Sequence, residues 1–334
     1  MTLVPKKIEL RKSFRYQRDL PWNYREEDAH RFSPIRLCEV SHAYLKEVKK
    51  VKVCQYYIFS GLQLLEEYCL PIQKRGKINT WKQWVKLQLF PEFSVDSALW
   101  VTDTWSKNYF HWVLECLPRI LTIRDLGLNI PILLPEHIYK APYVQDSLRD
   151  FNLEAITFNF RQSVKVKNLL LPSHDSPCAF DPEYLNKVVQ GYLYLDSPKE
   201  SNANKKVYIS RRGALKRKIE NEEELIPFLK KEGFEIVQME HLSFKQQREL
   251  MRETKVLVSL HGAGLANMIF MPKESIVIEL HPDVERYNSC FYHLAAAIGI
   301  GYCYSFEKGN HSNPQEADII VDLPNLQEIL KSFN

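Results

Sequence analysis

The stretch His261-Gly262-Ala263-Gly264-Leu265-Ala266-Asn267 decides the fold of this 334-residue chain, because of the patterns on either side of it. The run before it, residues 255–260, is apolar and β-branched, which predicts a buried strand. Residues 265–270 can begin a helix. A strand that turns through glycines into a helix directs backbone N–H groups and the positive end of the helix dipole at one point. That point suits a phosphate, and glycine permits close approach and a turn with positive φ.

Three known glycine motifs do not fit this turn. Asn267 stands where a dinucleotide fingerprint has its third glycine, and the following acid, Glu279, comes early, so an NAD site is not expected. No two of the 11 glycines are four residues apart, which excludes the Gly-x-Ser-x-Gly elbow of esterases. None are five apart, which excludes a P-loop. A tight strand-to-helix turn without a ligand remains the alternative.

Strands and helices alternate around this turn. The predicted strands are residues 207–210, 234–237, 255–260 and 275–280, with helices from Asn221 to Leu229 and from Phe244 to Glu253. This alternation predicts an α/β fold with a parallel sheet covered by helices on both faces. Because ligands bind beyond the carboxyl ends of such strands, one crevice can collect Arg211, His261 and Glu279.

The chain resembles glycosyltransferase family 61 at two blocks of motifs. The downstream block contains Tyr208-Ile209-Ser210-Arg211, Arg217, Asn221-Glu222-Glu223-Glu224, Leu242-Ser243, Gln246-Gln247, the stretch 261–267, Phe270, Pro272 and Ile278-Glu279-Leu280. The upstream block contains Asn108-Tyr109-Phe110-His111-Trp112, Glu115 and Leu117-Pro118-Arg119. Together they span about the central 180 residues, in the order expected for the family.

The resemblance implies an inverting, metal-independent transferase of the GT-B type. In that fold two Rossmann-like domains with parallel sheets face a central cleft, and the C-terminal domain binds the nucleotide-sugar. The chain exceeds the usual size of one hydrophobic core, so two domains are expected. We expect an acceptor-side domain with a basic extension at 1–195, a polar linker at 196–206 and a nucleotide-sugar domain at 207–322. Residues 323–334 are expected to form a helix that crosses back to the first domain.

The donor side has to stabilise a leaving diphosphate without a metal, since the chain contains no Asp-x-Asp. Arginine suits this task because its planar fork donates two hydrogen bonds together. Glu279 is expected to accept hydrogen bonds from ribose hydroxyls. The alternatives are a solvated arginine turn, and structural roles for His261 and Asn267. The predicted donor-binding residues are Ser210, Arg211, Arg217, His261, Gly262, Ala263, Gly264, Asn267 and Glu279. No cofactor or metal is expected.

The upstream block offers the candidates for the catalytic base. His111 and Glu115 are four residues apart and therefore neighbours on one helical face, and Asp103 precedes them by a short loop. A glutamate beside a histidine raises its basicity and fixes its tautomer. The alternative is that His111 caps a helix and that Glu115 pairs with Arg119. Asn108 and Trp112 are the predicted acceptor-binding residues, although a tryptophan at this position is more often part of a core.

The remainder of the N-terminal half shows a weaker pattern. Residues 98–101, 130–134 and 168–171 are predicted strands, and residues 111–121 are a predicted helix that Pro118 must bend or end. The first 50 residues hold 12 Lys or Arg against 7 Asp or Glu. This basic segment is expected to contact an anionic membrane or an anionic lipid-linked glycan. A solvated positive tail is the alternative.

The scattered, odd number of cysteines (7) predicts a reducing compartment. The lack of a signal peptide and of an apolar run of about 20 residues predicts a soluble or peripherally attached enzyme. We therefore expect a cytoplasmic enzyme, peripheral to the inner face of the membrane. The leading function is transfer from a UDP-sugar to a glycan or lipid-linked glycan in surface or capsular polysaccharide synthesis. A nucleotide-sugar epimerase and a non-catalytic glycan- or nucleotide-binding module are the alternatives. Nucleic acid is not an expected partner, because the basic residues elsewhere are mixed with acids.

Overall fold

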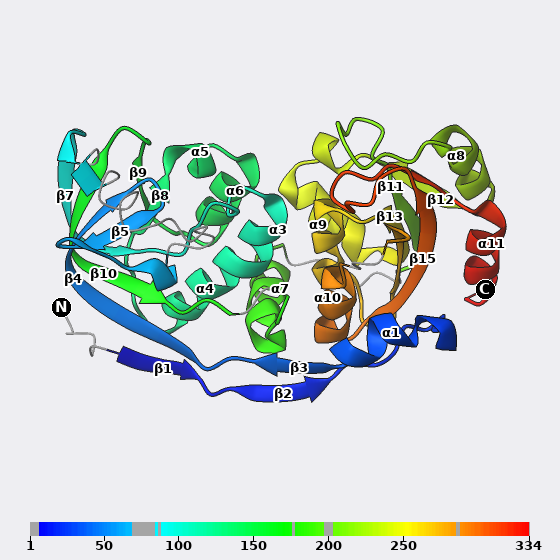
Figure 1. The fold of residues 1–334 in the computed structure, drawn as a ribbon, viewed down its shortest axis with the longest axis horizontal. Coiled ribbons are helices and arrows are strands. Elements are labelled where there is room, and N and C mark those ends of the chain that lie inside the picture. The colour runs from blue at the N-terminus through cyan, green and yellow to red at the C-terminus, as the bar shows by residue number, and fades with distance from the viewer. Residues whose placement is uncertain are drawn as a thin grey trace. The chain divides into compact units, whose positions relative to one another are not determined.

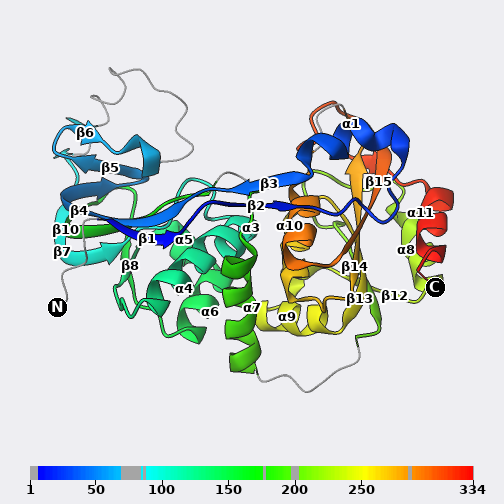
Figure 2. The ribbon, with the colours of Figure 1, turned by 90° about the horizontal axis from the view of Figure 1, so that it is seen from below.

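The computed structural model describes residues 7–68, 84–85, 88–175, 178–196, 203–284 and 288–333. The chain divides into two compact units, which the ribbons of Figures 1 and 2 show. Unit 1 comprises residues 1–14 and 40–176, and unit 2 comprises residues 15–39 and 177–334. Each unit contains its own sheet with parallel strands, so the predicted α/β class is confirmed.

Unit 1 is built on an eight-stranded sheet in the order β6-β5-β4-β10-β7-β8-β9, with β1 also paired to β4. Its described strands are β1 (Lys7–Arg11), β4 (Ala43–Cys54), β5 (Tyr57–Ser60), β6 (Gln63–Leu64), β7 (Glu92–Leu99), β8 (Ile132–Pro135), β9 (Ala155–Phe158) and β10 (Ser163–Pro172). Strands β7 to β10 are mutually parallel, whereas β1, β4, β5 and β6 pair antiparallel. The purely parallel sheet expected here is therefore wrong, and one reason is the two-residue turn after Cys54, which can join only antiparallel strands.

The helical part of unit 1 follows β7 and β8. Its described helices are α3 (Tyr109–His111), a π-helical turn (Trp112–Cys116), α4 (Leu117–Asp125), α5 (Glu136–Tyr139) and α6 (Pro142–Asp150). Pro118 was expected to bend or end the helix that begins near His111. Instead it occupies the first turn of α4, where proline's missing N–H costs little, and the π-helical turn lies directly before it.

Unit 2 is built on a six-stranded sheet in the order β12-β11-β13-β14-β15-β16. Its strands are β11 (Lys205–Ile209), β12 (Phe234–Val237), β13 (Thr254–Leu260), β14 (Ile276–Pro282), β15 (Gly301–Gly309) and β16 (Ile319–Ile320). All pairings except that of β16 are parallel, as predicted from the β-α alternation. The helices are α1 (Ala29–Phe32), α7 (Pro182–Asp196), α8 (Glu222–Lys231), α9 (Phe244–Arg252), α10 (Cys290–Ile298) and α11 (Leu323–Lys331).

Helices cover both faces of this sheet: α8 and α11 lie on one face, and α9 and α10 on the other (Figures 1 and 2). Helix α9 starts with a capping box between Ser243 and Gln246, worth about 1 kcal/mol. Helix α8 has no side-chain cap at Asn221. The Asn221 amide instead exchanges hydrogen bonds with the backbone of Val321, at 2.9 Å each way.

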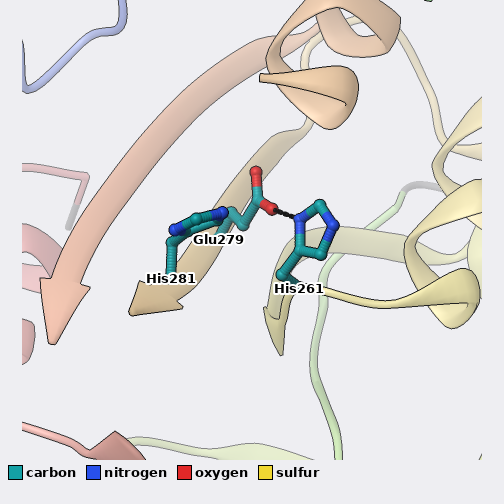
Figure 3. A group of neighbouring side chains, drawn as sticks. All are labelled: His261, Glu279 and His281. Carbon is teal, nitrogen blue, oxygen red and sulfur yellow. Dashed lines mark hydrogen bonds and ion pairs between the residues drawn. The ribbon is translucent and has the colours of Figure 1, made fainter. Parts of the chain in front are cut away.

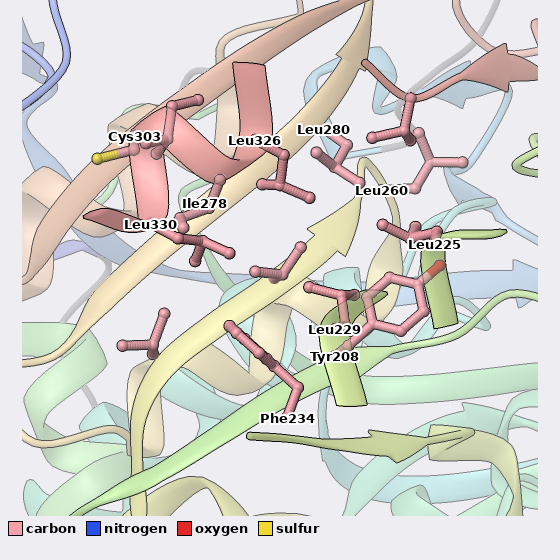
Figure 4. Packing of buried hydrophobic residues seen from close by; sticks show 14 of the residues in the cluster. Tyr208, Leu225, Leu229, Phe234, Leu260, Ile278, Leu280, Cys303, Leu326 and Leu330 are labelled. Carbon is pink, nitrogen blue, oxygen red and sulfur yellow. The ribbon is translucent and has the colours of Figure 1, made fainter. Parts of the chain in front are cut away.

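The C-terminal helix α11 packs into the core of unit 2. Leu326, Ile329 and Leu330 are buried against Val258 and Ile278 of the central strands (Figure 4). Fully burying a leucine or isoleucine side chain stabilises a fold by about 1.5–3 kcal/mol. The apolar face of α11 is therefore used within unit 2, which differs from the return to the first domain that the sequence suggested.

Two further segments pack with unit 2 although the sequence grouped them with the N-terminal domain. Helix α7 ends at Asp196, whose carboxylate is paired with the buried Arg248 and with Arg252 at 3.0 and 2.7 Å. In the segment 15–39, Trp22 donates its backbone N–H to Tyr302 at 2.8 Å. Residues 197–202 of the predicted linker lie outside the described residues, and its boundaries stay a prediction.

The remaining short strands, β2 (Phe14–Gln17) and β3 (Leu37–Val40), pair with each other. From Lys7 onward, the basic N-terminal segment is thus part of the fold, and Arg11 is paired with Asp175 at 2.7 Å. A solvated tail is therefore wrong for its described part. Among the described residues, no helix is long and apolar enough to cross a bilayer.

Candidate active site

Two arginines converge at the carboxyl end of β11, as the sequence predicted. Arg211 donates from Nε to the carbonyl of Arg217 at 2.9 Å and from Nη2 to that of Lys216 at 3.2 Å. Arg217 in turn donates from Nη1 to the carbonyl of His261 at 3.3 Å. Within the described residues, neither arginine forms an ion pair with a carboxylate. Two partly buried guanidinium groups thus lie together, held by backbone carbonyls.

Burial leaves these charges costly to maintain. Burial lowers the pKa of Arg211, and the nearby Glu240 and Tyr208 partly oppose this shift. Burial also lowers the pKa of Arg217, and the positive charge of Arg211 lowers it further. Arg217 also adopts a left-handed backbone conformation, with φ of 57°, which is uncommon for a residue other than glycine. Strain and unfavourable charge together are typical of a functional site that a ligand completes.

The glycine turn approaches Arg211 closely. A Cβ added at Gly262 would collide with Nη1 of Arg211, so a side chain at this position would force the guanidinium to move. Gly262 has φ of 174°, and Gly264 is not among the residues with positive φ. The positive φ expected for this turn is therefore wrong, and close approach alone explains Gly262. The helix that follows, Ala263–Phe270, is a 3-10 helix rather than an α-helix, but its first amides still lack partners within the helix.

His261 and Glu279 form a buried pair at the ends of β13 and β14 (Figure 3). His261 Nδ1 bonds to Glu279 Oε1, and the hydroxyl of Tyr302 donates to Glu279 Oε2 at 2.6 Å. Glu279 is completely buried, and Asn288 Nδ2 lies 3.1 Å from His261 Nε2. Glu279 was expected to bind ribose. In the structure its two oxygens instead contact His261 and Tyr302, so it orients the imidazole.

Two predicted donor-binding residues, Ser210 and Asn267, are buried and form hydrogen bonds within the protein. Ser210 is 3% exposed, and its hydroxyl donates to the buried carboxylate of Glu222 at 2.7 Å. Asn267 is completely buried and donates to the carbonyl of Gly264 at 3.1 Å and to Gln247 at 3.0 Å. Asn267 therefore has the structural role that was the alternative in the sequence.

The upstream block forms a second cluster, within unit 1. His111 Nδ1 lies 2.9 Å from Glu115 Oε2, and both side chains remain partly accessible. Arg119 is the alternative partner of Glu115. It does not pair with the Glu115 carboxylate but donates from Nε to the backbone carbonyl of Glu115 at 2.8 Å. The predicted His111–Glu115 pair is thus present. Because Nδ1 of His111 is bonded to Glu115, the other ring nitrogen of His111, Nε2, is the atom that can take up a proton.

Asp103 lies beyond β7 and is held by several donors. Its Oδ1 accepts from the backbone N–H groups of Trp105 and Ser106 at 2.8 and 3.0 Å, and its Oδ2 lies 3.5 Å from His174 Nε2. Burial favours the protonated acid, but the hydrogen bonds from His174, Ser106 and Trp105 outweigh it and hold the pKa of Asp103 below its usual range. Asp103 is therefore a carboxylate at neutral pH and a weak base.

Of the two predicted acceptor-binding residues, Asn108 is exposed and its role stays a prediction, whereas Trp112 presents no side chain to the surface. Asn108 caps α3, accepting from the N–H of Phe110 at 2.9 Å. Trp112 is completely buried, and its indole N–H donates to Ser147 at 2.9 Å. Trp112 is therefore a core residue, and it offers no face for stacking on a sugar ring.

Sequence reasoning missed two residues of this cluster. His174 follows β10, and Arg119 Nη2 lies 3.1 Å from its Nε2. Trp105 is 45% exposed, and its indole stacks on the imidazole of His111 with ring centroids 5.4 Å apart. The position of His174 directly after a predicted strand could have indicated it, but no sequence pattern distinguishes Trp105 from the other tryptophans.

Within the part of the chain that the structure describes, two groups of side chains could offer ligands to a metal ion. One comprises Asp103, Glu115 and His174, and the other comprises His261, Glu279 and His281. In the first group the guanidinium of Arg119 contacts His174 and would repel a cation. In the second, burial lowers the pKa of His281 to about 4, so this imidazole is neutral and can coordinate.

Comparison with known proteins places this geometry in a family. The fold and site define an α/β protein with two neighbouring arginines at the carboxyl ends of parallel strands. The family model described as Glycosyltransferase 61 matches residues 109–278, just over half of the chain. The chain belongs to glycosyltransferase family 61, which confirms the resemblance seen in the sequence and makes it a glycosyltransferase by family.

Individual relatives match over a shorter part. An EGF domain-specific O-linked N-acetylglucosamine transferase of Drosophila melanogaster is 30% identical over 114 residues, 31% of this chain and 22% of the relative. The protein of the same name from Mus musculus is 32% identical over 127 residues, 36% of this chain and 23% of the relative. The alignments thus span less than a quarter of the length of these relatives.

The cytoplasmic, reducing location expected from the cysteines is wrong. The relatives are named for acting on EGF domains, which are disulfide-dense modules of secreted proteins. In the structure, Cys178 and Cys290 form a disulfide, with 5.3 Å between their Cα atoms. Such bonds persist in oxidising compartments. The scattered spacing of the cysteines concealed this pair, which is 112 residues apart.

Proposed function

We propose that the chain is an inverting, metal-independent glycosyltransferase that moves a sugar from a UDP-sugar to an acceptor hydroxyl. Unit 2 would bind the donor and unit 1 the acceptor, in the GT-B manner that the family resemblance implies. The observation that carries this proposal is the pair Arg211 and Arg217, two partly buried cations beside the glycine turn that form no ion pair with a carboxylate in the described part of the chain. A diphosphate supplies the missing negative charge.

The arginines support the departure of the nucleotide. In a single displacement the acceptor oxygen attacks C1 of the sugar while the bond from C1 to the diphosphate oxygen breaks. The electron pair of that bond passes to the diphosphate, which is stabilised by positioned cations and amide N–H groups. Arg211, Arg217 and the amides of Ala263 and Gly264 are the groups of this chain that fit the task. Because the attack comes from the opposite side, the configuration at C1 inverts.

His261 supports the same step from the other strand end. Its Nδ1 is committed to the buried Glu279, which leaves Nε2 beside Asn288 as the atom that can face a ligand. Tyr302 holds the second oxygen of Glu279 and so fixes the carboxylate. With the Nδ1 hydrogen donated to Glu279, Nε2 is the acceptor of the neutral ring. We propose that it accepts a hydrogen bond from a hydroxyl of the sugar donor, and that Glu279 positions the ring instead of contacting ribose.

The proton of the acceptor hydroxyl has to be removed in unit 1. His111 is the proposed base, because Glu115 fixes its tautomer and stabilises the imidazolium that forms. Asp103 is a poorer base, since its hydrogen bonds stabilise the carboxylate. The exposed face of Trp105, stacked on His111, is the proposed platform for the acceptor in place of Trp112.

The relatives suggest the sugar and the acceptor. Since they are named for transferring N-acetylglucosamine to EGF domains, we propose UDP-N-acetylglucosamine as the donor and a hydroxyl of a protein domain as the acceptor. A surface glycan, free or lipid-linked, is the acceptor that the sequence suggested. A panel of UDP-sugars, scored by UDP release with an EGF domain, a free oligosaccharide or a lipid-linked glycan, distinguishes them.

Calorimetric titration with UDP tests the donor site directly. UDP should bind equally well with excess EDTA and with Mg²⁺ or Mn²⁺, because arginines replace the metal. When Arg211 is replaced, Lys216→Ala serves as the matched control for the loss of a positive charge. Lys216 lies in the same loop but pairs with Glu316 at 2.8 Å. Binding that requires the metal would refute metal independence and would direct attention to the two groups containing His174 and His281.

A further inference from the structure

We propose that unit 1 carries a second ligand site, which binds an acidic oligosaccharide. A pocket of about 930 Å³ lies over β4, β10 and β7, toward the amino-terminal ends of β7 and β10. Asp103 and His174 follow the opposite, carboxyl ends of these two strands. The volume is in the range of known ligand sites, roughly 300–1,000 Å³. The site belongs to unit 1 alone and does not depend on the function proposed above.

The floor of the pocket is a sheet face lined by lysines in two rows. In the first row Lys52, Lys165 and Ser94 are side by side in register on three neighbouring strands. Glu92 bridges the two lysines of this row and offsets half of their charge: one carboxylate oxygen lies 2.8 Å from Lys52 Nζ, and the other contacts Lys165. Like charges directly across strands are unfavourable, so the shared carboxylate explains how the first row is tolerated.

The second row has no such bridge. Lys50 and Lys167 lie between the register pairs that join β4 to β10. Lys167 is 3.9 Å from the largely exposed Asp96, a separation typical of a weak surface pair. Lys50 has φ of 54° and, among the described residues, forms no ion pair. An anionic group between these two lysines would relieve their repulsion.

The rim of the pocket adds aromatic and amide groups. The partly buried Phe90 and Trp84 line it, and the indole N–H of Trp84 donates to the carbonyl of Gly61 at 3.2 Å, which orients the ring. Gln88 is also part of the lining. Aromatic rings accept the apolar face of a sugar, and amide and hydroxyl groups bind its hydroxyls.

An acidic oligosaccharide is the class of ligand that uses all of these groups. Inorganic anions have no apolar face for the aromatic rim. A nucleic acid presents a phosphate at every residue and would meet Glu92 and Asp96 among the lysines, which disfavours it. Sugar hydroxyls, in contrast, donate to carboxylates, while uronic acid carboxylates pair with Lys50 and Lys167.

The test is a calorimetric titration of the full chain with hexagalacturonate and with neutral maltohexaose as the second probe. We expect hexagalacturonate to bind more tightly than maltohexaose. The double variant Lys50→Gln with Lys167→Gln should weaken its binding about tenfold, as expected for losing two partly screened charge contacts. Trp84→Ala should weaken both probes.

The matched control is Lys230→Gln with Lys231→Gln, which removes the same charge from the last turn of α8. It should change the affinity for hexagalacturonate less than twofold, and every variant should unfold at the parent temperature. The proposal is overturned if the parent does not bind hexagalacturonate, or if maltohexaose binds as tightly. It is equally overturned if the two double variants lose affinity alike, or if a single-stranded oligonucleotide of equal charge binds more tightly.

Discussion

The clusters of the two units differ in how their charged groups are held. In unit 2, Arg211 and Arg217 donate to backbone carbonyls, and the glycine turn touches the guanidinium of Arg211. In unit 1, His111 and Glu115 hold each other through their side chains and stay partly accessible. A group fixed by the backbone suits a constant charge such as a diphosphate. A group fixed by another side chain can change its protonation, as a base must.

The largest effect is expected from His111→Ala. Removing a general base typically slows a reaction by roughly 10²–10⁴-fold, so turnover with acceptor should fall by that factor while UDP affinity stays at the parent value. Glu115→Gln should show a smaller loss, because the imidazole remains. His30→Ala, at an exposed histidine, is the control. If both variants lose UDP binding, the cluster belongs to the donor site; if both keep turnover, Asp103 is the next candidate.

The next effect concerns the contact between Arg211 and Gly262. Arg211→Ala should weaken UDP binding by about 1.5–3 kcal/mol, the usual value for a charge-assisted hydrogen bond. Gly262→Ala should weaken it comparably, because the added methyl group displaces the guanidinium. The two losses should not add in the double variant, which a double-mutant cycle by calorimetry measures.

Gly264→Ala is the control for this pair of variants. A Cβ at Gly264 would make an ordinary contact of 3.4 Å with Ile209, so UDP affinity should remain close to that of the parent. Equal losses for Gly262→Ala and Gly264→Ala would mean that the turn tolerates no side chain at all. Additive losses in the cycle would mean that Arg211 is not displaced.

The smallest effect is a pH dependence of stability that comes from His281 in unit 2. Burial lowers its folded-state pKa to about 4, below the unfolded value of about 6.5. The stability tied to the neutral ring is therefore complete above about pH 6.5 and is lost as the pH falls toward 4. Between pH 7 and pH 5, the contribution of His281 to the free energy of unfolding falls by about 2 kcal/mol.

Urea unfolding of the parent and of His281→Asn at both pH values checks this. Between pH 7 and pH 5, the free energy of unfolding should fall by about 2 kcal/mol less in the variant than in the parent, whatever the stability of the variant at pH 7. An identical pH loss in both proteins would show that the ring is protonated, or solvated, in the folded state.

The sheet of unit 2 could be predicted from the sequence, and that of unit 1 only in part. Strands such as Phe234–Val237 lie within short apolar runs between amphipathic helices, and a regular β-α alternation permits few topologies. The antiparallel strands β4, β5 and β6 follow one another without a helix between them. The pairing of β4 with β10, more than 100 residues later, has no local signal.

The candidate site, like the sheets, could be predicted from the sequence only in part. The position of Arg211 and His261 at strand ends followed from the pattern, because parallel strands end at one edge of a sheet. The partners of Glu279 did not, since Tyr302 lies on another strand and its contact depends on packing in three dimensions. For the same reason Trp112 could not be assigned to the core until Ser147 was found beside its indole.

The disulfide between Cys178 and Cys290 also bears on how the protein must be made. Cys290 is two residues from Asn288 and directly precedes Phe291, and both of these contact His261. During synthesis, Cys178 leaves the ribosome 112 residues before its partner, and most of the unit 2 sheet is translated between them. Its thiol has to remain unreacted for that interval. Protein for binding experiments should therefore be produced in a host compartment that supplies a disulfide isomerase.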